Sequence, residues 1–551
     1  MTPAEIAAEL TSIYRTPSGT MALREVQGRI LLAADANGGV WSNAGVGSGK
    51  TLALALLLAV IGGDRPLILT EAANLPQMKS DFQRLRLHWK IPTYYRLESY
   101  HTLSQRPNFL EDLRPTFVGL DEVQNIKPYK ASGRARRVDR WRRAFPDVPM
   151  ACLSGTPGEM FEDYAHQMVW AAPALRSDRG GPIPVSDEGR PEGPEFKALC
   201  RKLREDEAFH AAWWKRLRES PGIVVCDGTN CDAELQIAHT VLPPPADMEA
   251  HWRRLREDAE APDGWVLDTG VGEQYQLARM LALGMYYEHI PRPPVEYTEP
   301  RKAWFGMCNR LIDAAESAPG GPYDTPGDVA KAVVGGRLPD GPLKAWQAVK
   351  DTYQPEVRAV WLSRHALDYA VAGGQRQARL ATATNGGSII WTSFIGLGEE
   401  LSRITGWHYF GDGACDATGR HVDQVCRPCS AGERIEPVII CSSYSCRTGK
   451  NLQYRYSHNL FLSSPSGLKD SEQLLGRTHR SQQPCDVVTA EIVYGCLEDW
   501  LSYLKAEATC QENLRDLTAT PKLLLAQHDR TSYPKSDDSL AWKRASRVEV
   551  T

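Results

Sequence analysis

The sequence of 551 residues contains no apolar stretch long enough to cross a membrane. Its longest apolar run, residues 52–61, is about half of the ~20 residues that a transmembrane helix needs. The N-terminal residues, MTPAEIAAEL, contain no basic cluster followed by a long apolar segment, so we expect no signal peptide. No repeat with a period of roughly 20–50 residues is apparent, which disfavours a solenoid or a propeller.

The chain also lacks an excess of one charge and a disulfide framework. Its 64 Lys and Arg residues against 68 Asp and Glu residues give a formal net charge of −4, which disfavours a generally basic nucleic-acid coat but allows a local basic track. The 13 cysteines are an odd number scattered through a long chain, which is typical of a reducing compartment. We therefore expect a cytoplasmic protein with no membrane partner.

Two stretches of the chain alternate short apolar runs with helical patterns, as α/β folds do. In the first stretch, strands are predicted at residues 39–42, 67–70, 116–120 and 150–153. In the second stretch, strands are predicted at residues 388–392, 437–441, 459–462 and 487–493. Between the two stretches, segments rich in Gly and Pro separate short predicted helices. We expect an α/β domain at 1–171, a largely helical insertion and linker at 172–358, a second α/β domain at 359–515 and a frayed polar tail at 516–551.

Residues 44–51 read Ala-Gly-Val-Gly-Ser-Gly-Lys-Thr and lie between a predicted strand and an apolar helix. In such a loop, successive backbone N–H groups form a nest for phosphates, and the N-terminus of the helix adds its dipole. Lys50 would reach the β- and γ-phosphates, and Thr51 would hold Mg²⁺. The other residues expected to line the nucleotide are Ala44, Gly45, Gly47, Ser48 and Gly49. The alternative, a Gly/Ser-rich surface loop before an ordinary helix, is disfavoured by this context.

Asp121 and Glu122 follow the apolar strand predicted at residues 116–120. The first acid of such a pair can hold Mg²⁺ through water, and the second can orient or deprotonate an attacking water. The alternative is a solvated turn after a strand. The phosphate-loop pattern upstream favours the chemical interpretation.

Residues 473–480, QLLGRTHR, begin a predicted helix in the second α/β stretch. Arg477 and Arg480 are three residues apart and would therefore share one helical face. Two arginines that face a nucleotide can neutralise charge in phosphoryl transfer. The alternative is a basic helix face in solvent.

Together these features resemble the superfamily 2 helicases and, within them, the SWI/SNF-like ATPases. Leu23-Arg24-x-x-Gln27 resembles the glutamine motif that reads adenine, and DEVQNIK at 121–127 resembles motif II with Gln124 in the place of the family's His. Ser-Gly-Thr-Pro at 154–157 resembles motif III. Further similar elements, in the family's order, lie at residues 67–78, 98–103, 389–393, 448–452 and 473–480. The resemblance covers about half of the chain.

This resemblance implies two RecA-like lobes, with ATP bound between them and ATP and Mg²⁺ as cofactors. The first lobe would supply Lys50, Thr51, Asp121 and Glu122, and the second would supply Arg477 and Arg480. Gln473 and Gly476 would also lie near the nucleotide. The implied activity is that of a hydrolase, an ATP-dependent DNA helicase or translocase that contacts the DNA backbone without reading its sequence. The compact form is similar to helicases of phages and prophages, which implies the cytoplasm of a bacterium or an infected cell and partners in replication, recombination or repair.

Two other functions stay open at this point. The protein is either such a motor, an ATP-switched nucleic-acid-binding scaffold with slow hydrolysis, or an RNA helicase. The residues of motifs II and III differ from those common in RNA helicases. Motif V carries Arg447 and Lys450 where the family has small residues, and these two cations are candidates for contact with a nucleic-acid phosphate.

Two further clusters receive structural interpretations. The arginines of residues 134–143 are a candidate phosphate-binding track, but we favour a helix whose arginines extend into solvent. The group of Cys415, His421, Cys426 and Cys429 has four potential zinc ligands, but its spacing is unlike a standard finger, and we favour a loop with free thiols. Cys226 and Cys231 receive the same interpretation.

Overall fold

The structure, a computed structural model, describes residues 1–45, 47–126, 133–158, 160–226, 231–258, 260–264, 271–314, 318–319, 323, 326–381, 386–426, 436–517 and 520–532. The chain forms two compact units. Unit 1 comprises Met1–Gly228, Pro291–Pro355 and Asn513–Ala519. Unit 2 comprises Thr229–Ile290, Glu356–Glu512 and Thr520–Thr551.

Unit 1 is built on a sheet of six parallel strands in the order β3-β2-β4-β5-β1-β6. The strands are β1 (Gly39–Asn43), β2 (Pro66–Thr70), β3 (Arg96–Ser99), β4 (Phe117–Asp121), β5 (Met150–Ser154) and β6 (Ile223–Val225). Parallel strands need crossover connections, and helices supply them here. The apolar strands have no polar alternation because both faces of the sheet are covered.

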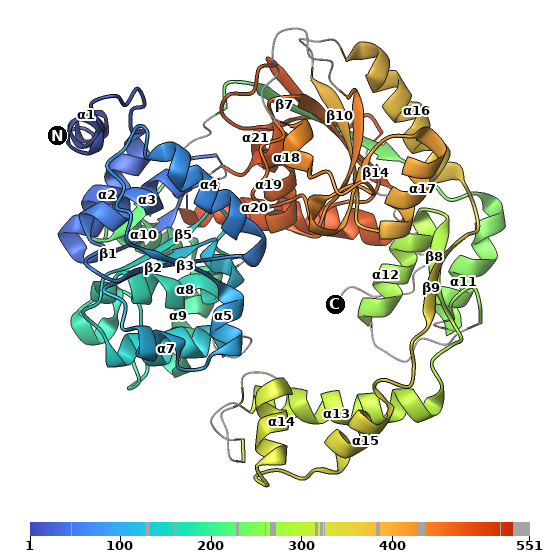
Figure 1. The fold of residues 1–551 in the computed structure, drawn as a ribbon, viewed down its shortest axis with the longest axis horizontal. Helices are drawn as coiled ribbons and strands as arrows, with labels where there is room; N and C mark the ends of the chain where they lie inside the picture. Colours follow the sequence, from blue (N-terminus) through green and yellow to red (C-terminus); the bar gives the residue numbers. More distant parts are fainter. Residues whose placement is uncertain are drawn as a thin grey trace. The chain divides into compact units, whose positions relative to one another are not determined.

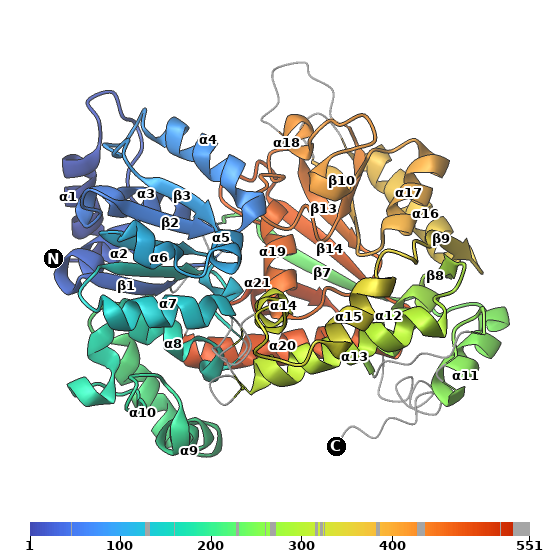
Figure 2. The same cartoon turned by 60° about the horizontal axis from the view of Figure 1, so that its bottom comes forward.

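Two helix layers enclose this sheet, as Figures 1 and 2 show. Along β2, Leu67 and Leu69 belong to one core and Ile68 to the other, because successive side chains point to opposite faces. The first layer contains α2 (Glu25–Asn37), α3 (Lys50–Val60) and α4 (Leu75–Leu85). The second layer contains α5 (Tyr100–Gln105), α6 (Phe109–Leu113), α7 (Gly133–Ala144) and α8 (Phe161–Ala171). Unit 1 also contains α1 (Pro3–Tyr14), α9 (Gly193–Glu205), α10 (Glu207–Arg218), α13 (Val295–Asp313), α14 (Pro326–Val334) and α15 (Gly341–Val349).

Unit 2 is built on seven parallel strands in the order β11-β12-β10-β13-β14-β7-β15. They are β7 (Glu234–Val241), β10 (Gly387–Thr392), β11 (Tyr409–Phe410), β12 (Val438–Ser442), β13 (Tyr456–Phe461), β14 (Val487–Tyr494) and β15 (Gln527–Asp529). One face packs against α16 (His365–Leu380) and α17 (Ile395–Thr405). The other packs against α18 (Val422–Val425), α19 (Leu468–Thr478), α20 (Leu497–Leu517) and α21 (Lys522–Leu525). The remaining elements are α11 (Glu249–Asp258), α12 (Val271–Ala282) and the antiparallel pair β8 (Met285–Ile290) and β9 (Glu356–Trp361).

The α/β class and all eight predicted strands are confirmed, with their ends shifted by a few residues at most. The course of residues 172–358 differs from the expected helical insertion, because β6 joins the sheet of unit 1 and β7 joins that of unit 2. The expectation of a frayed tail from residue 516 is wrong for the described part, since α21 and β15 follow α20 and β15 pairs with β7. Among the described residues, none of the helices combines the length and the apolarity that crossing a bilayer requires.

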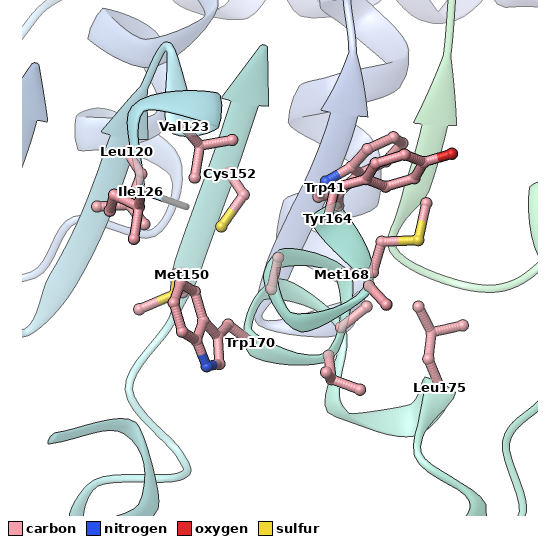
Figure 3. Packing of buried hydrophobic residues seen from close by; sticks show 14 of the residues in the cluster. Trp41, Leu120, Val123, Ile126, Met150, Cys152, Tyr164, Met168, Trp170 and Leu175 are labelled. Atoms are coloured by element: carbon pink, nitrogen blue, oxygen red, sulfur yellow. The ribbon is translucent and has the colours of Figure 1, made fainter. Parts of the chain in front are cut away.

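The core of unit 1 contains several closely packed aromatic rings. Trp41 of β1 stacks on Tyr164 of α8 with ring centroids 5.7 Å apart and planes 19° apart. Figure 3 shows this pair beside Met168, and Trp170 beside Met150 at the start of β5. The Trp41 side chain is fully buried, so the stack ties the strand that precedes the 44–51 loop to the second helix layer.

We expect Trp41→Ala to lower the free energy of unfolding of unit 1 by about 3–5 kcal/mol, because a large cavity replaces the indole. Chemical denaturation followed by far-UV circular dichroism measures this loss. Leu32→Ala on α2, where 43% of the residue is exposed, is the control and should change stability by under about 0.5 kcal/mol. An equal effect of both substitutions would contradict the packing described.

Candidate functional site

The candidate site of unit 1 forms where three parallel strands end. Asn43 at the end of β1 is paired with Ser154 at the end of β5. Asp121 at the end of β4 is paired with Leu153 of the same neighbour. The loops that follow β1, β4 and β5 therefore leave the same edge of the sheet, which is where open parallel sheets bind ligands.

The loop between β1 and α3 depends on glycine at two positions. Gly47 has φ +89° and Gly49 has φ +83°, a region that residues with a Cβ rarely adopt. A Cβ on Gly49 would also lie only 2.2 Å from Nε2 of Gln27. The alanine at the start of the pattern is tolerated because Ala44 packs, fully buried, in the core under the loop. Val46 lies outside the described residues.

Lys50 begins α3, with Thr51 directly after it, and turns its ammonium back toward the loop. Its Nζ donates to the carbonyl of Ala44 at 3.0 Å and lies 3.8 Å from Oε1 of Glu122. The side chain is 9% exposed. The site therefore holds a cation between the loop and the acidic pair.

Gln27 and Arg24 support the loop from α2. The Gln27 carboxamide accepts from the Arg24 backbone N–H at 2.9 Å and donates to the carbonyl of Gly49 at 3.1 Å. The Arg24 guanidinium donates to the carbonyl of Gly47 at 2.6 Å. These bonds assign Gln27 a part in shaping the loop, which the sequence did not reveal, and its reading of adenine stays a prediction.

Asp121 is buried, with 6% of the residue exposed, and receives bonds from two neighbouring segments. The Thr70 hydroxyl donates to its Oδ2 at 2.8 Å, and the Tyr100 hydroxyl donates to its carbonyl oxygen at 2.5 Å. Burial raises the pKa of Asp121 to about 7, and the negative charge of Glu122 acts in the same direction. Lys50 and the Thr70 bond oppose this rise in pKa. The position therefore favours a cation beside the carboxylate.

Glu122 has a left-handed backbone, with φ +49°, although it is not glycine. Such conformations cost of order 1–3 kcal/mol and concentrate at functional sites. Its Oε2 accepts from Nε2 of Gln124 at 2.6 Å. The side chain is 19% exposed, so the carboxylate is accessible while its direction is set by Gln124.

Gln124 connects the acidic pair to the loop after β5. The Ser154 hydroxyl donates to Oε1 of Gln124 at 2.6 Å and accepts from the backbone N–H of Thr156 at 2.9 Å. A chain of contacts thus runs from Lys50 through Glu122 and Gln124 to the 154–157 segment. The sequence placed these motifs in order but gave no signal for the contact between Gln124 and Ser154.

A second group of expected residues lies in unit 2. Both Arg477 and Arg480 donate to the carbonyl of Lys450, at 3.0 Å and 3.4 Å. The expectation that they share a helical face is wrong, because α19 ends at Thr478 and Arg480 lies beyond it. Convergence on one carbonyl, not helical spacing, brings the two guanidinium groups together.

The C-terminal segment supports this arginine pair from the interior. Glu472 is buried and accepts from the backbone N–H of Lys522 at 2.5 Å, and burial raises the pKa of Glu472 to about 6. Lys522 also lies 3.2 Å from Nδ1 of His479, whose Nε2 lies 2.9 Å from the carbonyl of Ala233. The expected nucleotide residues Gln473 and Gly476 are buried on α19.

The two cations of the predicted motif V have protein partners. Arg447 forms an ion pair with Asp470 at 2.7 Å. Lys450 lies 3.0 Å from Nε2 of His421 and 3.6 Å from Oδ2 of Asp423. A phosphate at either cation would have to compete with these contacts, and contact with nucleic acid stays a prediction.

The arginines of residues 134–143 only partly match the expectation of a helix whose arginines extend into solvent. Arg137 and Arg142 are buried, and Arg137 donates to the carbonyl of Leu103. Protein acceptors also bind the other arginines of α7, namely Ser104 for Arg134, Tyr323 for Arg136, Glu111 for Arg140 and Asp139 for Arg143. The favoured expectation holds for Arg140 and Arg143, whose side chains are exposed, and is wrong for the buried Arg137 and Arg142.

The candidate zinc group is only partly described. The backbones of Cys415 and His421 form an isolated antiparallel β-bridge. Cys426 is buried, and Cys429 lies outside the described residues. His421 has Asp423 on one ring nitrogen and Lys450 on the other. Within the described part of the chain, no three His, Cys, Asp or Glu side chains are arranged to hold a metal ion. Neither Cys226 nor Cys231 forms a disulfide.

No protein-family model matches the sequence, and no curated protein matches it. These comparisons therefore assign no family, and the chemistry of the site is argued from its residues.

We expect Asp121→Asn to stabilise the protein in the absence of nucleotide. Below pH ~4 the carboxyl is protonated in both the folded and the unfolded chain, so its ionisation has no effect on stability. As the pH rises from about 4 to the folded-state pKa of about 7, the unfolded chain ionises first, and stability is lost. Asparagine does not ionise, so the variant does not undergo this loss of stability, which amounts to roughly 2–4 kcal/mol above pH ~7.

Thermal melts of the wild type and Asp121→Asn between pH 5.5 and 8.5 measure this difference, with the range chosen to bracket the shifted pKa of about 7. The advantage of the variant should grow up to about pH 7 and then level off. A constant or shrinking difference would show that Asp121 titrates normally.

Proposed function

We propose that this protein is an ATP hydrolase that moves along DNA, with its two α/β units acting as RecA-like lobes. The observation that carries the proposal is the chain of contacts from Lys50 through Glu122 and Gln124 to Ser154. It joins a phosphate-loop pattern to an acidic pair at the edge of a parallel sheet, which is the arrangement that ATP hydrolysis requires.

The residues present fit a nucleotide with Mg²⁺. Gly47 and Gly49 adopt the positive φ angles that allow a backbone nest around phosphates, and Lys50 supplies the adjacent cation. Thr51 and Asp121 offer oxygen ligands, the type that Mg²⁺ prefers. A bound Mg²⁺ would neutralise charge on the β- and γ-phosphate oxygens.

Glu122 is the residue we assign to the attacking water. Its carboxylate is accessible, and Gln124 holds one of its oxygens at 2.6 Å, so it can accept a proton from a water in a defined direction. Lys50 lies 3.8 Å from the other oxygen. An arriving phosphate would attract this ammonium and free Glu122 for the water.

Arg477 and Arg480 are assigned to the transition state. Two guanidinium groups held by one carbonyl oxygen can stabilise the charge that develops as the γ-phosphoryl group transfers. By its resemblance to SWI/SNF-like ATPases, the chain would place them across the nucleotide from Lys50. Closing and opening of the two units during hydrolysis would then produce the movement along DNA.

The resemblance and the residues of motifs II and III support DNA, rather than RNA, as the nucleic acid along which the protein moves. By the same resemblance, the contacts with the DNA backbone are assigned to the loops of the Ia, Ib, IV and V elements. The proposal places the protein in the cytoplasm of a bacterium or an infected cell, in replication, recombination or repair.

Steady-state ATPase assays with no nucleic acid, single-stranded DNA, duplex DNA and RNA test this function. We expect DNA to stimulate hydrolysis and Glu122→Gln to lower the stimulated rate at least about 10²-fold, because the base is lost while nucleotide contacts remain. Stimulation by RNA alone would instead make the protein an RNA helicase. A rate near zero with every nucleic acid would contradict a motor that acts alone and favour the ATP-switched scaffold.

Gln124→Leu should lower kcat about tenfold and leave the KM for ATP nearly unchanged. The leucine removes the amide that aims Glu122 and binds Ser154, but it does not touch the 44–51 loop. Gln124→His, which introduces the residue of the resembling family, provides a ring N–H that can donate to Glu122 and is the matched control. If both variants kept the wild-type kcat, the contact would have no part in the reaction.

A further inference from the structure

Unit 1 contains a cavity of about 250 Å³ away from the candidate nucleotide site. It lies between α7, the end of α8 and residues 173–189. Arg142 from its wall donates to the carbonyl of Val148, just before β5 begins, so the cavity lies toward the amino-terminal edge of the sheet. Figure 3 shows Trp170, another wall residue, at this end of β5. Lys50 and Asp121 lie at the opposite, carboxyl-terminal edge.

Arg142 is buried but keeps hydrogen-bond donors for a ligand. Only 7% of the residue is exposed, and its Nη1 donates to Val148 at 2.5 Å and, more weakly, to Phe145 at 3.4 Å. Among the described residues, no acceptor binds its Nε or Nη2, and neither atom is sealed from solvent. These donors therefore open into the cavity.

A second cation on the wall, Arg179, is exposed, and within the described part of the chain its guanidinium makes no hydrogen bond or ion pair. Together with the hydrogen bond from Arg176, the charge of Arg179 helps to lower the pKa of the neighbouring Asp178 carboxyl. Arg176, in contrast, is paired with Asp178 through two bonds, and a Cβ on Gly189 would lie 2.3 Å from its Nη2, which shows how closely the turn packs on it. Burial, together with the charge of Arg179, lowers the pKa of Arg142 to about 10.

The acids of the wall are largely engaged with other arginines. Asp139 binds Arg143 and Arg190 at 3.2 Å and 2.9 Å. Glu188 binds Arg190 at 2.5 Å and lies 3.6 Å from Arg143. Asp187 is the remaining wall acid, and it is exposed. The wall therefore carries four arginines, Arg142, Arg143, Arg176 and Arg179, and three acids, two of which are already engaged with Arg143 and Arg190.

We propose that this cavity binds the phosphate group of a small phosphorylated molecule through Arg142 and Arg179. Guanidinium groups match phosphate oxygens in geometry and charge, and a dianion can use donors from both. Trp170, Val169 and Pro173 would contact the remainder of the ligand. At about 250 Å³ the cavity lies just below the usual range of roughly 300–1,000 Å³ for ligand pockets, which favours a compact molecule over a nucleic-acid backbone.

Isothermal titration calorimetry of the full chain with inorganic phosphate tests the site. Arg179→Ala should weaken binding about tenfold, because one charged donor group is lost. Asp187→Asn should tighten it about two- to fivefold, because a repulsive charge leaves the wall. Arg201→Ala removes an equally exposed arginine from α9 and should leave affinity unchanged.

Lys50→Ala distinguishes the cavity from the 44–51 loop, which is also an anion site. Binding that persists in Lys50→Ala and falls in Arg179→Ala supports the proposal. Binding that is lost in Lys50→Ala and unchanged in Arg179→Ala assigns phosphate to the loop and overturns it, without touching the proposed ATPase activity. Titration with thymidine 5′-monophosphate and with a 5′-phosphorylated oligonucleotide separates the possible sources. Binding of the oligonucleotide alone would overturn the small-molecule assignment.

Discussion

The placement of two adjacent acids at the end of β4, Asp121 buried and Glu122 partly exposed, is the constraint on which the candidate site of unit 1 depends. A carboxylate removed from water is unfavourable unless donors or cations surround it. For Asp121 and Glu122 the partners come from separate segments: Thr70 at the end of β2, Lys50 at the start of α3 and Gln124 in the turn after β4. These segments meet only because β2, β4, β5 and β1 are consecutive neighbours in one parallel sheet. The order of the strands therefore determines which side chains surround the acidic pair.

Unit 2 positions its charged groups by a different means. The guanidinium groups of Arg477 and Arg480 donate to one backbone carbonyl, and α19, which carries Arg477, is anchored by its buried acid Glu472. The partners of that acid lie 50 residues later in the chain, where the backbone N–H groups of Lys522 and Leu523 donate to it and the charge of Lys522 favours its ionised form. Loss of this segment would leave the buried charge uncompensated. The docking of α21 and β15 is thus coupled to the geometry of Arg477 and Arg480.

Local signals in the sequence were sufficient for the eight predicted strands, and they located the phosphate-loop pattern and the acidic pair. Each depends on a short pattern: apolar runs, glycines at positive φ, or acids after a strand. Contacts between distant segments were not predictable in this way. β7 was missed because its partners, β14 and β15, lie about 250 and 290 residues later. The end of α19 at Thr478 was missed because no glycine marks it, and the left-handed residue nearby is Gln482, with φ +66°.

The arginines of unit 1 show why a basic cluster in a sequence is a poor guide to its function. A guanidinium has five N–H donors, and what it can bind depends on how many of them the protein already uses. Arg137 contacts a carbonyl and a carboxylate, so its charge is compensated within the fold. Arg142, five residues later on the same helix, uses one nitrogen and leaves the others open to a cavity. The net charge and the residue spacing of the sequence do not distinguish Arg137 from Arg142. The acceptors around them distinguish a residue that holds the fold together from one that is available to a ligand.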